Sequence, residues 1–291
     1  MLINLLKAMR PRQWAKNAFV LAALLFDGRL TDLGAVSRSV LALAVFCALS
    51  GAVYLINDLA DVENDRQHPT KRLRPLASGS LSPAVARVAA ALLILGSLGL
   101  AAATVPAILL IAVIYLALMV LYTFVLKHIV ILDVMAIAAG FVLRVAAGAL
   151  AVQVSRFSPW LYVCTTLLAL FIALNKRRHE LVLLDSSAAQ HRAILREYTL
   201  PFLDEMTSLV TATTLAAYSF YTFSAPNLPA NHTMMLTIPF VLYGIFRYLY
   251  LIHVRDLGGS PEDIVLGDRP LLIDILLWAA TAGVVLYWPW R

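Results

Sequence analysis

Long apolar runs separated by short polar segments make up most of this chain. The longest runs without Asp, Glu, Lys or Arg cover residues 88–126 and 206–246. Each is long enough for two helices that cross a bilayer, because one crossing needs about 20 apolar residues. Pro106 divides the first run, and the segment SAPNLPAN divides the second. The whole pattern predicts about nine transmembrane helices, over residues 17–26, 39–57, 83–104, 107–126, 129–152, 159–175, 206–223, 234–253 and 270–288.

The predicted fold class is all-α, because a backbone in lipid must satisfy its own hydrogen bonds. We expect a polytopic membrane protein whose helices form a bundle around a cytoplasm-facing site. No linker or low-complexity stretch divides the chain, so residues 1–291 are predicted to form a single transmembrane domain. The segments 17–126 and 129–253 are similar enough in layout to suggest an internal pseudo-repeat, with the last helix added.

Composition supports a membrane protein and suggests its orientation. Hydrophobic residues make up 61% of the chain and charged residues only 14%, whereas soluble domains carry about a quarter charged residues. Lys and Arg gather on the predicted loops that share a face with the N-terminus, which places the N-terminus and the large loops in the cytoplasm. The expected location is therefore the cell inner membrane. Part of the net charge of +6 is this insertion signal, so basicity alone does not prove an anionic substrate.

Two of the predicted helices end in dense charge on the same face. The first end reads NDLADVENDRQHPTKRLRPLASG from Asn57, and the second reads NKRRHEL from Asn175. In the first, Asn57, Asp61 and Asp65 recur every four residues and would share one helix face, with Asp58 beside them. A divalent cation would remove the repulsion between these carboxylates, and Mg²⁺ prefers such oxygen ligands together with substrate phosphates. A solvated helix end is the simpler alternative.

Basic residues follow the acidic ones directly. Lys71, Arg72 and Arg74 are suited to phosphate oxygens, since Arg binds them in a fork and Lys acts as a point charge. For each residue alone, the topology signal is an alternative explanation. Carboxylates that hold a metal beside cations that hold phosphate together indicate a diphosphate site.

The spacing Asn57-Asp58-x-x-Asp61-x-x-x-Asp65 resembles the first aspartate-rich motif of the UbiA-type membrane prenyltransferase superfamily. Members of that superfamily carry a second aspartate-rich motif after the sixth helix, where this chain has three cations in NKRRHE instead. This departure, together with the stretches RPRQWAKN and GGSPEDIVLGDRPLL, is similar to the decaprenyl-phosphate phosphoribosyltransferase branch. That branch transfers a 5-phosphoribosyl group from phosphoribosyl diphosphate (PRPP) to a polyprenyl phosphate.

The resemblance implies roles for individual residues. Asp58, Asp61 and Asp65 would be catalytic and, with Asn57, would hold Mg²⁺ as the cofactor. Substrate would be bound by Lys16, Asn57, Lys71, Arg72, Arg74, Lys176, Arg177, Arg178 and Glu180. Glu180 has an equally good alternative in a local salt bridge with Arg177 or Lys176. The expected partners are PRPP, polyprenyl phosphate and the lipid bilayer, with no nucleic acid, and the oligomeric state is open.

Two other functions compete with this interpretation. The nearer one is a prenyltransferase that moves a prenyl group from a prenyl diphosphate to an aromatic or other small acceptor. The retained first motif favours it, and the missing second motif counts against it. The other is a transporter, whose charged groups would lie near the bilayer midplane rather than at one face.

Overall fold

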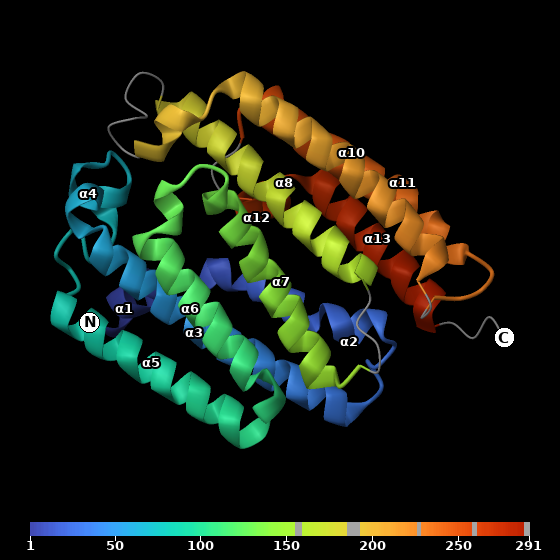
Figure 1. Ribbon diagram of the computed structural model, residues 1–291, viewed down its shortest axis with the longest axis horizontal. Coiled ribbons are helices and arrows are strands. Elements are labelled where there is room, and N and C mark those ends of the chain that lie inside the picture. Colours follow the sequence, from blue (N-terminus) through green and yellow to red (C-terminus); the bar gives the residue numbers. More distant parts are fainter. Residues whose placement is uncertain (155–158, 185–192, 226–227, 258–260, 288–291) are drawn as a thin grey trace. The chain divides into compact units, whose positions relative to one another are not determined.

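A computed structural model describes residues 1–154, 159–184, 193–225, 228–257 and 261–287 (Figure 1). These residues form helices joined by turns, with no strand among them, so the all-α prediction is confirmed. The chain divides into two compact units. The first comprises Met1–Leu24 and Arg29–Val154, and the second comprises Leu25–Gly28 and Ser155–Arg291. The single domain and the pseudo-repeat stay predictions.

Within the described residues, seven helical segments are long and apolar enough to cross a membrane. They are Leu33–Ala60, Pro83–Thr104, Pro106–Phe124, Leu132–Val152, Pro159–Val182, Thr233–His253 and Arg269–Tyr287. Each overlaps one of the predicted spans. The remaining two predictions fall on the 3₁₀ segment η1 (Pro11–Leu21) with the short α2 (Ala22–Phe26), and on α10 (Leu200–Ser224), a threonine-rich helix. The count of nine therefore stays a prediction.

The first unit is built around the long helix α3 (Leu33–Ala60). Its other elements are α1 (Leu2–Met9), η1, α4 (Val62–Gln67), η2 (Lys71–Leu73), α5 (Pro83–Thr104), η3 (Pro106–Ile108), α6 (Leu109–Phe124), η4 (Leu126–His128) and α7 (Leu132–Val152). Helix α3 packs against α5, α6, α7 and η1. Side-chain caps set the helix starts: Asp32 accepts from the Ala35 N–H at 3.0 Å, and Ser82 accepts from the Val85 N–H at 3.3 Å.

Helix α7 is the most enclosed of the first unit's apolar helices. In its most apolar window 61% of residues are buried, against 22% for α5 and for Pro106–Phe124. Small residues let its backbone approach η1 closely. A Cβ added at Gly148 would lie only 1.9 Å from the Val20 carbonyl oxygen. Only glycine fits at this crossing.

Arg144 of α7 is a buried cation whose hydrogen-bond partners in the described structure are neutral. Its Nε donates to Asn17 Oδ1 at 2.7 Å, its Nη2 to the Tyr115 hydroxyl at 2.8 Å, and its Nη1 to the Gly140 carbonyl at 2.8 Å. The guanidinium also lies 4.7 Å from the centre of the Tyr115 ring. Arg144 thus ties η1 and α6 to α7.

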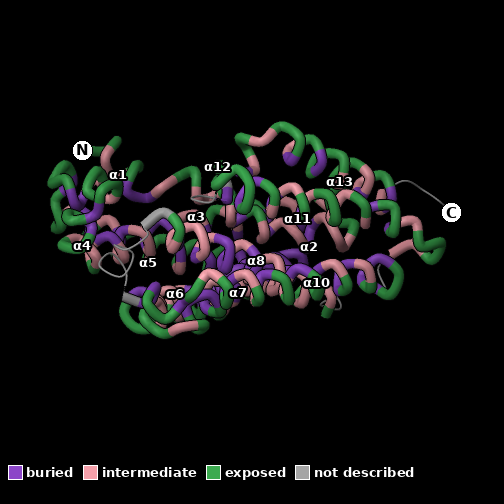
Figure 2. The backbone as a smooth tube through the Cα atoms, turned by 90° about the horizontal axis from the view of Figure 1, so that it is seen from above, coloured by how far each residue is buried: buried purple, intermediate pink, exposed green. Residues whose placement is uncertain are grey.

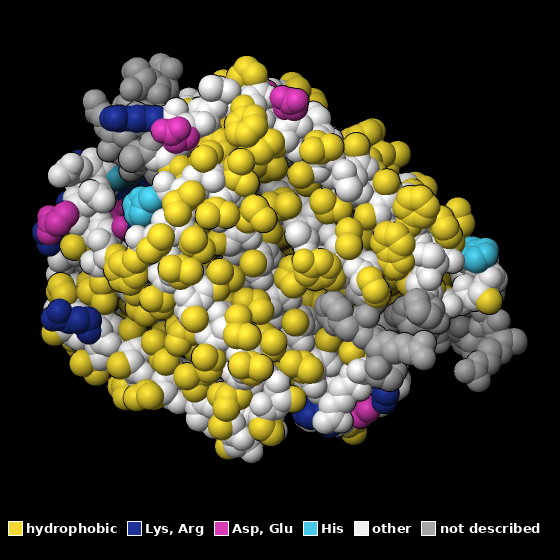
Figure 3. Space-filling view, in the orientation of Figure 1, with side chains coloured by type: hydrophobic (Ala, Val, Ile, Leu, Met, Phe, Trp, Pro, Cys, Tyr) yellow, Lys and Arg dark blue, Asp and Glu magenta, His cyan; other side chains and the backbone are white. Residues whose placement is uncertain are grey.

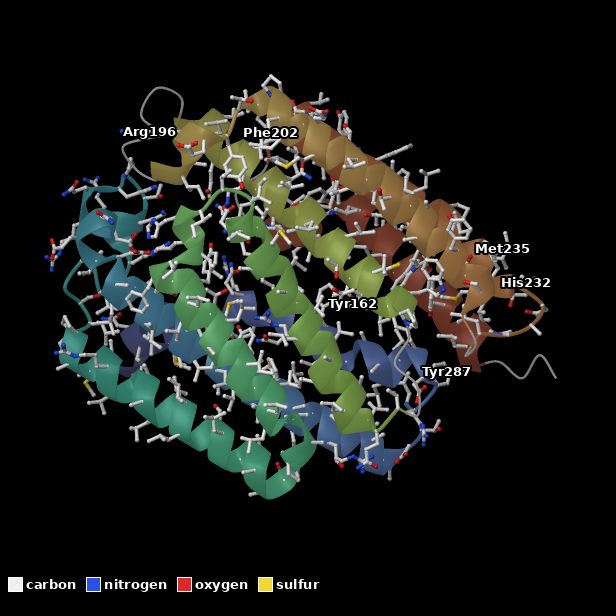
Figure 4. All side chains as sticks on the ribbon, viewed as in Figure 1. Tyr162, Arg196, Phe202, His232, Met235 and Tyr287 are labelled. Atoms are coloured by element: carbon white, nitrogen blue, oxygen red, sulfur yellow. The ribbon has the colours of Figure 1, made fainter. Side chains whose placement is uncertain are left out.

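The second unit contains α8 (Pro159–Leu184), η6 (Ala193–Glu197), α10, η7 (Thr233–Thr237), α11 (Ile238–His253), α12 (Pro261–Gly267) and α13 (Arg269–Tyr287). Helix α8 packs against α10, and α11 packs against α13. Asp268 caps α13 by accepting from the Leu271 N–H at 2.9 Å, and it also accepts a fork of two bonds from Arg247. The Arg247 bonds hold the pKa of Asp268 below its usual value. Figure 4 shows Phe202 at one end of α10, with His232 and Met235 beyond the other end.

Exposed apolar side chains identify the lipid-facing surfaces. On α5, Val88, Leu92 and Leu95 lie along one side and are each at least 60% exposed. Buried and exposed positions follow one another along the helices (Figure 2), and hydrophobic side chains cover most of the face seen in Figure 3. This surface is typical of helices that lie in lipid. The protein is a multi-pass membrane protein.

Candidate active site

The acidic segment lies where α3 gives way to α4. Helix α3 ends at Ala60 and α4 begins at Val62, with Asp61 between them. The Asp61 N–H donates to the Asn57 carbonyl at 3.0 Å, and the Asp65 N–H donates to the Asp61 carbonyl at 2.8 Å, so the helical spacing is maintained across the break. The sequence predicted that Asn57, Asp61 and Asp65 share one face with Asp58 beside them. In the structure Arg74 joins Asp58 and Asp65, while Asp61 pairs with Lys127.

Asp58 and Asp65 are buried and share a cation. Arg74 Nη1 lies 2.6 Å from Asp65 Oδ2 and 3.2 Å from Asp58 Oδ1. Arg10 Nη2 donates to the same Asp58 oxygen, and its guanidinium lies 4.7 Å from the centre of the Tyr54 ring. Burial lowers the pKa of Arg10 from its usual value, and the Asp58 charge opposes that shift. Two guanidinium groups therefore compensate two buried carboxylates.

Asp61 is paired with a lysine from a distant turn. Lys127 Nζ, on η4, lies 2.6 Å from Asp61 Oδ1. Neither Lys127 nor Arg10 was among the predicted site residues. Two features of the sequence could have indicated them: Arg10 lies in the stretch RPRQWAKN, and Lys127 is the one Lys or Arg between residues 88 and 143. Lys16, which was predicted, donates to Gln13 Oε1 on its own segment.

The basic loop after α4 is shaped by His68. Its Nδ1 accepts from the backbone N–H groups of Thr70 and Lys71, at 3.2 and 3.3 Å. The following residues Leu76 and Leu81 pack into the apolar cluster that includes Leu55 of α3. This anchoring leaves the three predicted phosphate binders in different settings: Arg72 is exposed, Lys71 is half-buried, and Arg74 is turned to the carboxylates.

The acidic residues fit a hard divalent cation by their chemistry. The donor set is oxygen alone, from Asn57, Asp58, Asp61 and Asp65. Asp58 Oδ2 is buried and has no hydrogen-bond partner in the described structure, which is unusual for a carboxylate oxygen. No group of three His, Cys, Asp or Glu side chains in the described ranges is already arranged as a metal site. The support for a divalent cation here is therefore the all-oxygen donor set and the unpartnered Asp58 Oδ2.

The second charged segment lies on α8, in the second unit. Arg177 is only 1% exposed and donates to Glu180 one turn later, so Glu180 makes the local salt bridge that was its alternative. Arg178 Nε lies 2.7 Å from Asp204 Oδ1 on α10, a partner the sequence pattern did not indicate. Lys176 is half-buried on the same turn. This end of α8 therefore holds three cations in a row, two of which are paired with carboxylates.

Comparison with known proteins identifies the class. The UbiA prenyltransferase family matches residues 18–260, and the chain belongs to this family of membrane transferases. It is 36% identical over 299 residues to decaprenyl-phosphate phosphoribosyltransferase from Mycolicibacterium smegmatis, across 98% of this chain and 92% of that protein. It is 35% identical over 284 residues to the protein of that name from Mycobacterium tuberculosis, across 96% and 93% of the two chains. The resemblance inferred from the motifs is confirmed.

A solved structure shares the fold. A UbiA homologue from Archaeoglobus fulgidus, bound to GPP and Mg²⁺, superposes with a TM-score of 0.74. The match covers 97% of this chain and 99% of that one, at 20% sequence identity. At that identity the likeness establishes the fold.

Proposed function

We propose that this protein transfers the 5-phosphoribosyl group of PRPP to a polyprenyl phosphate such as decaprenyl phosphate, and releases pyrophosphate. The segment Asn175–Glu180 carries the proposal, because it has three cations where a second acidic motif would serve a prenyl diphosphate. The full-length similarity to phosphoribosyltransferases supports the same conclusion.

Asn57, Asp58, Asp61 and Asp65 would hold Mg²⁺, a role supported by the orphaned Asp58 oxygen and by the Mg²⁺ in the Archaeoglobus homologue. The ion would neutralise charge on the departing pyrophosphate. Arg74 uses Nη1 for both carboxylates, and a guanidinium has five N–H donors, so it can hold a phosphate oxygen at the same time. Lys71 and Arg72 would contribute further contacts to the donor phosphates.

The nucleophile is the acceptor's phosphate oxygen, which is already ionised at neutral pH. No general base is therefore required, and catalysis rests on positioning and on charge stabilisation. The oxygen attacks C1 of ribose as the diphosphate leaves from the opposite side, which inverts C1. Lys176, Arg177 and Arg178 would hold the 5-phosphate or the lipid phosphate, and Lys16 would meet the lipid phosphate at headgroup height.

We also propose that the charged loops face the cytoplasm of a cell whose inner membrane holds the protein. The Lys and Arg bias supports this orientation. It agrees with the chemistry of the substrates, since PRPP is a soluble metabolite and the acceptor's tail requires a bilayer.

A donor competition tests the proposal. Purified protein in detergent with Mg²⁺ receives labelled PRPP with polyprenyl phosphate, or a prenyl diphosphate with an aromatic acceptor. We expect a phosphoribosyl lipid from the first mixture, lost in Asp61→Ala and in Arg177→Ala. Glu63→Ala is the control, because Glu63 is exposed and its ion pair is with Arg66. Prenylated product without use of PRPP would support the prenyltransferase alternative instead.

A further inference from the structure

Two threonines on α10 depart from the usual behaviour of hydroxyls in these helices. Thr213 and Thr214 each donate to the carbonyl one turn back, at 2.8 and 2.6 Å. Thr207 and Thr211 are buried, only 3% and 8% exposed, yet their Oγ1 atoms have no partner in the described structure. They are four residues apart and share one face of α10. Helix α10 therefore presents two unsatisfied hydroxyls to the interior of its unit.

A third unsatisfied atom belongs to α8. Asn175 is fully buried, and its Nδ2 donates to the Phe171 carbonyl at 2.8 Å. Its Oδ1 has no hydrogen-bond partner among the described residues. The Asn175 amide is thus held by its Nδ2, and its Oδ1 can still accept a hydrogen bond. Each such buried polar atom costs free energy unless something else satisfies it.

The register of the two helices brings these residues to neighbouring turns. Arg178 Nε contacts Asp204 Oδ1 at 2.7 Å near one end, and the Trp160 and Phe220 rings stack at 5.9 Å near the other. Helices α8 and α10 are therefore antiparallel. Asn175 comes three residues before Arg178, and Thr207 comes three residues after Asp204, so along each helix axis the displacement from the ion-paired residue is about 4.5 Å, in the same direction.

Thr211 lies one further turn along, at the level of Phe171, whose carbonyl holds the Asn175 amide. The resulting stripe has one acceptor and two groups that donate or accept, all of them neutral. The cations Arg177 and Arg178 stand on the next turn toward the end of α8. A ligand that suits this arrangement has an anionic end and several hydroxyls next to it.

We propose that Asn175, Thr207 and Thr211 form a subsite for the hydroxyl groups of the ribose ring. A pentose 5-phosphate has a phosphate for the arginines and a vicinal diol for the neutral stripe. An isoprenoid chain would leave all three atoms unsatisfied, so the subsite also separates the proposed donor from a prenyl diphosphate. This inference rests on the proposed function and specifies how that donor is recognised.

The test compares variants with substrates that lack one hydroxyl. Thr207→Val and Thr211→Val remove a hydroxyl at nearly constant shape, and Thr214→Val is the matched control, since Thr214 is equally buried and bonds to its own helix. Labelled PRPP and its 2-deoxy and 3-deoxy analogues serve as donors. We expect kcat/KM for PRPP to fall about 10- to 100-fold in Thr207→Val or Thr211→Val. With the deoxy analogue that lacks the hydroxyl bound by the substituted threonine, kcat/KM should be the same in the variant and in the wild type.

Thermal stability provides a second, independent reading. If the hydroxyls serve the substrate, replacing them by methyl groups removes an unsatisfied polar atom, and the Tm should stay the same or rise. A lower Tm with unchanged discrimination between PRPP and the deoxy analogues would mean a structural role and would overturn the proposal. Losses no greater than in Thr214→Val would overturn it as well. A wild-type protein that forms no phosphoribosyl lipid would instead contradict the proposed function itself.

Discussion

Replacing Gly148 by Ala should destabilise the first unit strongly. The new Cβ would lie 1.9 Å from the Val20 oxygen and 2.8 Å from its carbonyl carbon, whereas contacts below 3.0 Å essentially never occur. Helix α7 and η1 would therefore have to separate by about 1.1 Å. The atoms that the new Cβ would meet belong to the Val20 backbone, so no flexible side chain can move aside. Overpacking of this kind costs about 1–3 kcal/mol.

The separation would also break a buried hydrogen bond. Asn17 lies one turn from Val20 and Arg144 one turn from Gly148, and their bond of 2.7 Å would lengthen beyond hydrogen-bonding range. Leaving those groups unsatisfied adds about 1–3 kcal/mol. Ala is favoured over Gly in a helix by about 1 kcal/mol, which offsets only part of the loss. The net effect should be a destabilisation of about 3 kcal/mol.

The assay is the thermal unfolding of purified protein in detergent, followed by size-exclusion chromatography of the soluble fraction. Gly148→Ala should lower the Tm by roughly 5 °C or more. Gly96→Ala on α5 is the control, because a Cβ there meets nothing within 4 Å, and its Tm should not fall. Equal Tm values for the two variants and the wild type would refute the close approach of α7 to η1.

Three further predictions concern charged groups. Arg144→Met should lower the Tm, because it leaves the buried Asn17 Oδ1 without its donor, and an unchanged Tm would argue against that network. Asp58→Asn should raise the Mg²⁺ concentration for half-maximal activity about tenfold or more in a metal titration after EDTA treatment, whereas the exposed Glu63→Gln should not. Because the pKa of Asp268 is lowered in the folded state, its stabilisation is present above about pH 4 and is lost as pH falls through the folded pKa. The Tm difference between wild type and Asp268→Asn should therefore shrink below pH 4, and a constant difference would contradict this.

The hydrophobic pattern was sufficient to predict most of the helices, because a membrane span is defined by its length and its apolar composition. The helix starting at Pro83 was predicted to its last residue, Thr104. The segment 17–26 shows the limit, since the pattern predicted a span but not its local form, a 3₁₀ segment followed by a short helix. The close approach of the Val20 backbone to Gly148 of α7 also leaves no periodic signal in the sequence.

The candidate site could be predicted only where its residues are neighbours in sequence. Spacing indicated Asn57, Asp61 and Asp65 on one face with Asp58 beside them, and in the structure one arginine contacts Asp58 and Asp65. The partners Arg10 and Lys127 come from distant segments, and only tertiary contact joins them to the motif. The roles predicted for the site residues in binding metal and substrate remain predictions for the experiments above.

The contact between Arg10 and Asp58 has a practical consequence at the N-terminus. Arg10 directly follows α1, a short helix whose Leu2, Ile3 and Leu6 side chains are 72%, 69% and 50% exposed. Exposed apolar side chains on a short helix are typical of helices that lie in the membrane interface. A bulky fusion at Met1 or a change from bilayer to micelle would shift this helix, and would thereby displace Arg10 from the Asp58 carboxylate that it compensates. Activity measured on N-terminally tagged protein would therefore report on the tag and the detergent as well as on the enzyme.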